Sequence, residues 1–216
     1  MSHLPIYIYA ELGALITSLL TFRALKGTAF RLFPFFLLFI VVVELAGDYT
    51  GRVLHYKNSW LYNISTTLEF IFYTYIFSCT LRDPAYKKMT LGFMVFFPLL
   101  VLLNMTFIQG FTEFHSYTNA LGSILVIIFC CLFFYELLLN PLEGQLHKVP
   151  MFWVSTGILF FYLGDLSFDL LYNLLKNDAM GRDLFKSINN NLILILYSCF
   201  IIAFLCQRNL VKSLLH

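Results

Sequence analysis

Seven long apolar runs, separated by short connections, dominate this chain. A helix needs about 20 apolar residues to cross the roughly 30 Å of hydrocarbon in a bilayer, and each run reaches or approaches that length. Short connections make successive helices antiparallel neighbours. We therefore predict an all-α fold, a polytopic membrane protein with a bundle of seven transmembrane helices. The predicted helices cover about Pro5–Phe22, Leu32–Tyr49, Trp60–Leu81, Met89–Ile108, Ser116–Leu139, Met151–Leu175 and Ile188–Cys206.

The composition agrees with a membrane protein. Hydrophobic residues make up 60% of the chain and charged residues 12%, whereas soluble domains average roughly 45–50% and 25%. The predicted spans leave no stretch for a separate soluble domain, so we predict a single transmembrane domain over residues 1–216, with the lipid bilayer as its surroundings. The net charge of +2 is small and the basic residues are scattered, which argues against a nucleic-acid partner. A six-span alternative would place the first run in the membrane interface.

The basic residues also predict an orientation. Cytoplasmic loops of membrane proteins carry an excess of Lys and Arg. Nine of the 14 Lys and Arg residues fall on one side of the predicted bundle and five on the other. This bias predicts an N-terminus outside and a C-terminus in the cytoplasm, with the inverted orientation as the alternative.

The sixth run carries a polar stripe within Gly157–Asn173. Asp165, Asp169 and Asn173 are spaced at i, i+4 and i+8, so on a helix their side chains lie along one face. The second run carries a similar acidic pair, Glu44 and Asp48. A carboxylate that faces lipid costs several kcal/mol, and acidic groups at membrane depth therefore face the bundle interior or a water-filled cavity.

Most polar residues within the predicted spans fall in the outer half of the membrane. We interpret this clustering as a polar cavity that opens outward and binds a small polar or cationic ligand. The predicted ligand-binding residues are Glu11, Glu44, Asp48, Glu69, Asn119, Asp165, Asp169, Asn173 and Asn190. The alternative is that these groups hydrogen-bond neighbouring helices and serve packing, which applies most to Asn63, Asn104 and Asn119.

A divalent cation is the cofactor that this pattern would accept. Carboxylate oxygens are the ligands that hard cations prefer, and the four predicted metal ligands are Glu44, Asp48, Asp165 and Asp169. A histidine zinc site does not fit, because all five histidines fall in predicted tails or connections. A retinal protein does not fit either, because the run Ile188–Cys206 has no lysine for a Schiff base.

Three functions are compatible with the acidic residues. The favoured one is a receptor-like or sensor module that passes its signal to a partner or acts as a homodimer. A proton- or cation-coupled small transporter is the first alternative, since the second and sixth runs carry similar acidic pairs. A Mg²⁺-dependent enzyme acting on a lipid phosphate or prenyl substrate is the second, although the fuller acidic motif of prenyltransferases is missing. The pattern favours binding over catalysis.

The segment NISTTLEFIFY, together with the richness in Asn and Phe, resembles multi-pass inner-membrane proteins of Bacteroidetes-type bacteria. The seven-run layout is also similar to the seven-pass receptor-like modules that precede bacterial signalling domains. These resemblances imply a location in the bacterial inner membrane. They rest on no diagnostic motif and imply no activity.

Overall fold

The computed structural model describes residues 5–140, 146–175 and 179–214, and within them all side chains except those of residues 168–175, 179–183, 185–186 and 214. All regular structure in these ranges is helical, which confirms the all-α prediction. The α-helices are α1 (Ile6–Leu20), α2 (Phe22–Leu25), α3 (Phe33–Arg52), α4 (Ser59–Thr80), α5 (Pro84–Leu103), α6 (Ser116–Leu139), α7 (Pro150–Leu175) and α8 (Ala179–Leu214). The shorter turns are η1 (Ala29–Leu32), η2 (Asn104–Ile108), which is a π-turn, and η3 (Leu146–Lys148).

Each predicted span overlaps a helix, although the first reaches from α1 into the short α2, and two helices begin well before their predicted start. α5 begins at Pro84 rather than Met89, because the Asp83 side chain caps it by accepting the N–H of Ala85 at 2.7 Å and proline suits the first helical position. α8 begins at Ala179 rather than Ile188. Its first two turns carry Arg182, Asp183 and Lys186, which interrupt the apolar run, so counting apolar residues missed them.

Four helical segments in the described part of the chain are long and apolar enough to cross a membrane. They are Ala29–Arg52, Pro84–Ile108, Ser116–Leu139 and Ser187–Ser213. α1 is apolar but has only 15 residues. α4 has 22 residues, and its Asn, Ser, Thr and Tyr side chains make it less apolar. The structure is therefore that of a helical protein with several membrane-span candidates, and the number of seven spans stays a prediction.

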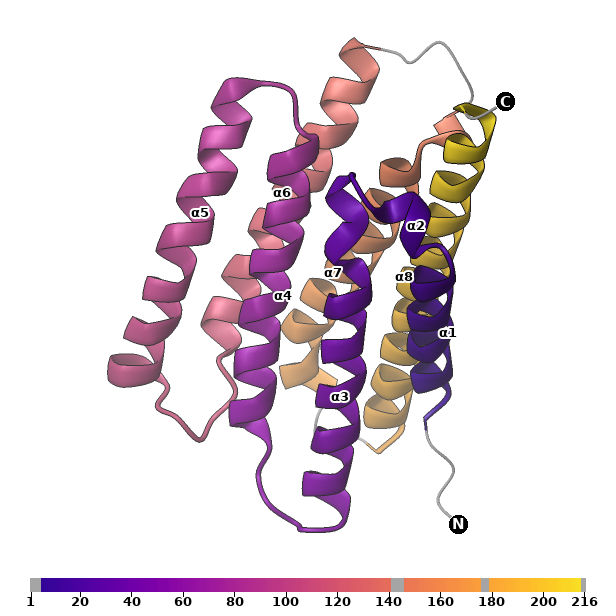
Figure 1. Cartoon of the computed structure of the whole chain (residues 1–216). Helices are drawn as coiled ribbons and strands as arrows, with labels where there is room; N and C mark the ends of the chain where they lie inside the picture. The colour runs from indigo at the N-terminus through magenta and orange to yellow at the C-terminus, as the bar shows by residue number, and fades with distance from the viewer. Residues whose placement is uncertain (1–4, 141–145, 176–178, 215–216) are drawn as a thin grey trace. The chain divides into compact units, whose positions relative to one another are not determined.

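The chain divides into two compact units, each described here by itself. Unit 1 comprises Met1–Pro34 and Leu137–His216, and unit 2 comprises Phe35–Glu136. Unit 1 thus holds α1, α2, α7 and α8, and unit 2 holds α4, α5 and most of α3 and α6 (Figure 1). The single transmembrane domain over residues 1–216 stays a prediction.

In unit 1, α8 packs against both α7 and α1. α7 comes close to α8 at Gly157, where an added Cβ would lie 2.8 Å from Cys199 Cβ and 3.2 Å from the Leu196 carbonyl oxygen. Small residues at such points let helix backbones approach closely. Phe33 adds edge-on contacts to Phe200 and Phe204 of α8, with ring centroids 5.2 Å apart in both pairs.

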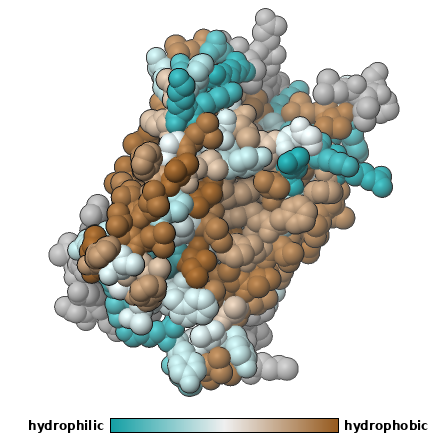
Figure 2. All heavy atoms as spheres, turned by 60° about the vertical axis from the view of Figure 1, so that its left-hand side comes forward, coloured by the Kyte–Doolittle hydropathy of each residue, from teal (hydrophilic) through white to brown (hydrophobic). Residues whose placement is uncertain are grey.

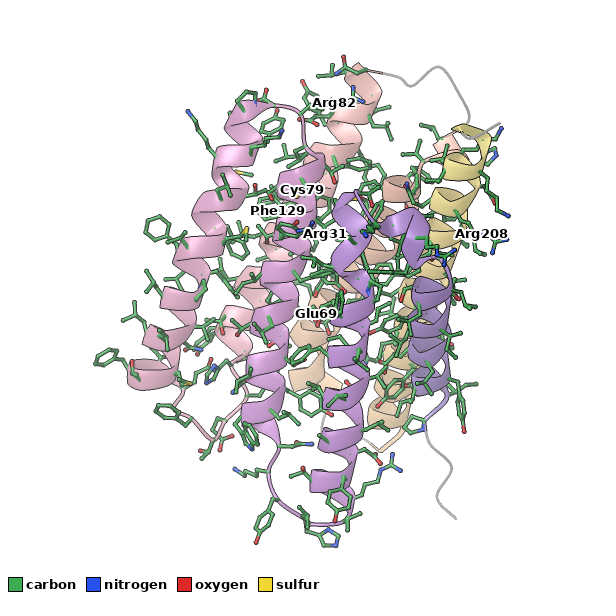
Figure 3. The ribbon with its side chains drawn as sticks, viewed as in Figure 1. Arg31, Glu69, Cys79, Arg82, Phe129 and Arg208 are labelled. Carbon is green, nitrogen blue, oxygen red and sulfur yellow. The ribbon has the colours of Figure 1, made fainter. Side chains whose placement is uncertain are left out.

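In unit 2, aromatic rings fill the space between α4, α5 and α6. Phe93 and Phe97 of α5 have centroids 4.7 Å apart, and Phe97 also meets Phe70 of α4 edge-on at 5.4 Å. Phe129 of α6 joins the cluster through Phe93 at 5.8 Å (Figure 3). Such tilted and edge-on pairs add to the burial of apolar area and fix how the helices pack.

The surface is also apolar over large areas. Figure 2 shows hydrophobic atoms over much of the visible face. Many large apolar side chains are exposed along the helices of unit 2, among them Leu38, Val95, Phe96 and Phe107. Soluble monomers rarely expose so many. Such a surface fits a membrane protein, as the four span candidates among the described residues also do.

Candidate functional site

The predicted acidic residues of unit 1 lie on α1 and α7. Glu11 on α1 is buried, with 3% of its surface exposed, and Asp165 on α7 is half-buried. Both take part in polar or electrostatic interactions. Asn190 on α8 is half-buried. The side chains of Asp169 and Asn173 lie outside the described residues, so the polar stripe on α7 can be followed only to Asp165.

The predicted residues of unit 2 lie on α3, α4 and α6. Glu44 on α3 is half-buried, and so is Glu69, which lies near the middle of α4 (Figure 3). Asn119 on α6 is buried. Asp48 is bonded to Arg52 one turn further along α3, with 2.6 Å between its Oδ1 and Nε. Its side chain is 27% exposed. Asp48 therefore already has a cationic partner at the end of its helix.

No metal centre is formed by the described residues: nowhere among them do three or more His, Cys, Asp or Glu side chains converge. The predicted divalent-cation site used Glu44, Asp48, Asp165 and Asp169, of which Asp169 is outside the described side chains. This site stays a prediction, and so does the outward cavity lined by the nine predicted ligand-binding residues.

A second polar cluster, which sequence reasoning did not assemble, lies at one end of unit 2. Buried Asn63 of α4 contacts the connection between α5 and α6 through both ends of its amide group. Its Oδ1 accepts the backbone N–H of His115 at 2.9 Å, and its Nδ2 donates to the Glu113 carbonyl at 2.8 Å. The Glu113 side chain forms an exposed ion pair with Lys57 at 2.8 Å. Asn63 thus serves the packing role predicted as its alternative, with a loop rather than a helix as its partner.

Side chains that follow the end of α5 also form hydrogen bonds within the connection between α5 and α6. Buried Asn104 donates from Nδ2 to Gln109 Oε1 at 2.8 Å and, at 3.4 Å, to Thr118 Oγ1 on α6. Gln109 in turn donates to Ser116 Oγ at 2.9 Å. Gly110 follows with φ +75°, a conformation that glycine adopts without strain. The connection is therefore fixed by side chains at both of its ends.

His115 is the residue that these bonds position. It is 3% exposed, and its Nε2 lies 2.8 Å from the carbonyl oxygen of Gly110. Since a carbonyl oxygen only accepts, Nε2 is the donor in this contact. Nδ1 is buried and has no hydrogen-bond partner among the described residues. A buried acceptor without a donor costs about 1–3 kcal/mol.

His115 lines a pocket of about 490 Å³ between α4 and α5. Pockets of roughly 300–1,000 Å³ with apolar walls and a few polar groups are typical of small-molecule sites. Here the polar lining residues are Asn63, Thr67 and His115. The main apolar lining residues are Ile64, Leu68, Val101, Leu102 and Met105. Sequence reasoning placed His115 in a connection and gave it no role, because its partner Asn63 is 52 residues away.

Comparison with known proteins gives no relative. No protein-family model matches the chain, and no curated protein or solved structure does so. In the part of the chain that the structure describes, the fold is all-helical and has four membrane-span candidates.

Proposed function

We propose that this protein is a seven-span receptor-like or sensor module of the bacterial inner membrane, with its N-terminus outside and its C-terminus in the cytoplasm. α1, α4 and α7 would add to the four span candidates. α4 and α7 have 22 and 26 residues, enough to cross a bilayer. α1, with 15 residues, would cross with flanking residues or by local thinning of the membrane.

The ligand in this proposal is a small polar or cationic molecule, or a divalent cation, bound by acidic side chains in the outer half of the spans. One observation carries it: the carboxylates on these helices are withdrawn from the surface. Glu11 is buried, and Glu44, Glu69 and Asp165 are half-buried. Carboxylates kept at membrane depth are expensive and usually serve a function. The signal would pass to a partner protein or across a homodimer.

A cation titration tests the proposal. The full chain, reconstituted in lipid nanodiscs, is titrated with Mg²⁺, Ca²⁺ and spermidine as three probes, and its melting temperature is recorded. A ligand that binds only the folded state stabilises it by RT ln(1 + [L]/Kd), which is about 2.7 kcal/mol at a hundredfold excess over Kd. We expect a saturable rise with one of the probes.

Acid-to-amide variants identify the residues responsible. The rise in melting temperature is expected to be lost in Glu44→Gln and in Asp165→Asn. It should persist in Glu113→Gln, whose side chain is 62% exposed and paired with Lys57. A protein that none of the probes stabilises, or variants that respond like the wild type, would contradict a cation-binding acidic site.

A further inference from the structure

A second pocket lies in unit 1, between η3 and the last turns of α8. We propose that it binds the phosphate group of an anionic phospholipid, whose acyl chains then lie along the apolar surface of α8. The proposal goes beyond the proposed function and uses none of the acidic residues on which that function depends.

The lining of this pocket offers hydrogen-bond donors to a phosphate group. The pocket measures about 390 Å³, and its lining residues are His147, Lys148, Cys206, Asn209, Leu210 and Ser213. The four polar ones are exposed, so a ligand can reach their polar groups. Lys148 and Asn209 carry N–H donors, which phosphate oxygens accept, and a donor with a full charge forms the stronger bond. Neither Asp nor Glu is among the lining residues.

This end of unit 1 carries cations that no described carboxylate neutralises. α2 packs against α8, and Figure 1 shows it beside the last part of that helix. The nearest described acidic side chains of unit 1 are Glu11, about 15 Å back along α1, and Asp165, about 22 Å along α7. Six exposed cations without an ion pair to a described residue lie here: Arg23, Lys26, Arg31, Lys148, Arg208 and Lys212 (Figure 3). Their summed field attracts an anion.

Two helix ends next to the pocket act with opposite sign. α8 ends at Leu214, where its last carbonyls are equivalent to about half a negative charge. α7 begins at Pro150, directly after η3, and its first amides are equivalent to about half a positive charge. These two effects largely cancel. The full charges of Lys148, Arg208 and Lys212 therefore decide the sign, and the pocket favours an anion.

The turn that presents Lys148 is held in place without a ligand. The His147 carbonyl accepts the indole N–H of Trp153 on α7 at 2.8 Å and the thiol of Cys206 on α8 at 3.4 Å. η3 is thus attached to both helices, and Lys148 stays next to the end of α8. Preorganisation of this kind reduces the ordering cost of binding.

The surroundings of the pocket favour a lipid over a soluble phosphate ester. Ile202 and Leu205 are 36% and 40% exposed, and they lie one turn before the lining residues Cys206 and Asn209 on the same face of α8. Trp153, whose indole bonds to the turn at the pocket, suits the interface between hydrocarbon and water. The pocket is therefore at headgroup depth, with an apolar surface for acyl chains below it. Basic pockets between membrane helices are known to bind anionic headgroups.

The two tryptophans of the chain provide a reporter and its control. Trp60→Phe leaves Trp153, which is bonded to the turn at the pocket. Trp153→Phe leaves Trp60, which lines the pocket between α4 and α5, where neither Lys nor Arg is among the lining residues. The nearby Lys57 is paired with Glu113. Each full-length variant is reconstituted in phosphatidylcholine bilayers that contain increasing fractions of a lipid with brominated acyl chains, because bromine quenches tryptophan fluorescence on contact.

The brominated lipid is either phosphatidylglycerol or phosphatidylcholine. Both contain the phosphate, but phosphatidylcholine also carries a quaternary ammonium, which Lys148 repels. We expect half-maximal quenching of Trp153 at an about tenfold lower fraction of brominated phosphatidylglycerol than of brominated phosphatidylcholine, the factor that corresponds to about 1.4 kcal/mol. Trp60 should be quenched about equally by the two lipids.

Neutralising single cations separates the pocket from the general field of this end. Lys148→Gln should lower the preference of Trp153 for phosphatidylglycerol about fivefold, the contribution of one basic residue at an anionic surface. The matched control is Lys26→Gln, which removes an exposed cation of α2 that does not line the pocket and should keep most of the preference. Both side chains are exposed, so both variants should fold like the wild type.

Equal quenching of Trp153 by the two lipids would overturn the proposal. The same preference at Trp60, or equal losses in Lys148→Gln and Lys26→Gln, would mean attraction by surface charge and no site at the pocket. Millimolar glycerol 3-phosphate should leave the quenching unchanged, and reversal by it would reassign the pocket to a soluble phosphate ester. Because these measurements use no added cation and no acidic variant, their failure is distinguishable from failure of the acidic site.

Discussion

The Glu136 carboxylate, near the end of α6, accepts the backbone N–H of Asp83 at 2.8 Å. It also accepts the N–H of Arg82, at 2.8 Å and 3.1 Å from its two oxygens (Figure 3). These amides directly precede α5, and the first amides of a helix have no partner within it. These hydrogen bonds join α6 to the start of α5. Because Glu136 is buried, water does not compete for them.

Glu136→Gln is expected to destabilise unit 2. Whichever oxygen becomes the NH2 group, one of the two 2.8 Å hydrogen bonds is lost and a donor then faces a backbone N–H, which costs about 1–3 kcal/mol. The melting temperature of the purified protein, followed by circular dichroism, measures the loss. Glu113→Gln serves as the control, because an exposed ion pair contributes only about 0–1 kcal/mol. Equal melting temperatures for the two variants would mean that Glu136 does not hold α5.

Gly122→Ala tests the packing of α6 on α4. A Cβ at Gly122 would lie 2.5–2.7 Å from three ring carbons of Phe70, and Phe70 is only 2% exposed. Overpacking of this kind typically costs about 1–3 kcal/mol. Gly92→Ala on α5 is the matched control, since nothing lies within 4 Å of the added Cβ. That change should raise stability by about 0.5–1 kcal/mol. The two melting temperatures should therefore move in opposite directions, and a shift of the same sign would contradict the packing.

Gly157→Ala tests the contact of α7 with α8. The added methyl would meet Cys199 Cβ at 2.8 Å and the Leu196 carbonyl at 3.2 Å, and neither atom can rotate away because both belong to rigid parts of α8. We expect a loss of about 1–3 kcal/mol. Cys199→Ala should not relieve it, since alanine keeps the Cβ, whereas Cys199→Gly should. A double-mutant cycle measures this coupling, and additive effects in the Cys199→Gly pair would place the contact elsewhere.

Apolar run length was enough to predict where the long helices are. α6 has the predicted bounds Ser116–Leu139, and α7 begins one residue before the predicted Met151. Helix ends that depend on polar residues were harder to predict, as α5 and α8 show. The number of spans depends on how polar a helix can be and still enter the membrane, and α4 carries Asn63 near its start and Glu69 near its middle. Whether so polar a helix crosses the membrane depends on which neighbouring helices cover its polar side chains, and the length of the apolar run does not show this.

The candidate acidic site stays a prediction, and the sequence bears only on the burial of its carboxylates. Glu11, Glu44, Glu69 and Asp165 are buried or half-buried, as the cost of exposing a carboxylate to lipid predicts. The pairing of Asp48 with Arg52 follows from their i, i+4 spacing. No local pattern relates His115 to Asn63, because their contact depends on where the connection between α5 and α6 folds back.

The orientation predicts which end of α4 is reached from outside. With 22 residues at about 1.5 Å each, α4 spans about 33 Å, the thickness of the hydrocarbon core. Single cysteines at Lys57, before α4, and at Lys87, after it, are introduced into a variant whose five native cysteines are replaced by alanine. A membrane-impermeant maleimide should label Lys57→Cys in right-side-out vesicles and Lys87→Cys only in inverted ones, because basic loops stay in the cytoplasm. Lys212→Cys near the end of α8 should behave like Lys87→Cys, since both lie on the predicted cytoplasmic side. The opposite pattern would invert the topology, and equal labelling of both positions in both kinds of vesicle would mean that α4 does not cross the membrane.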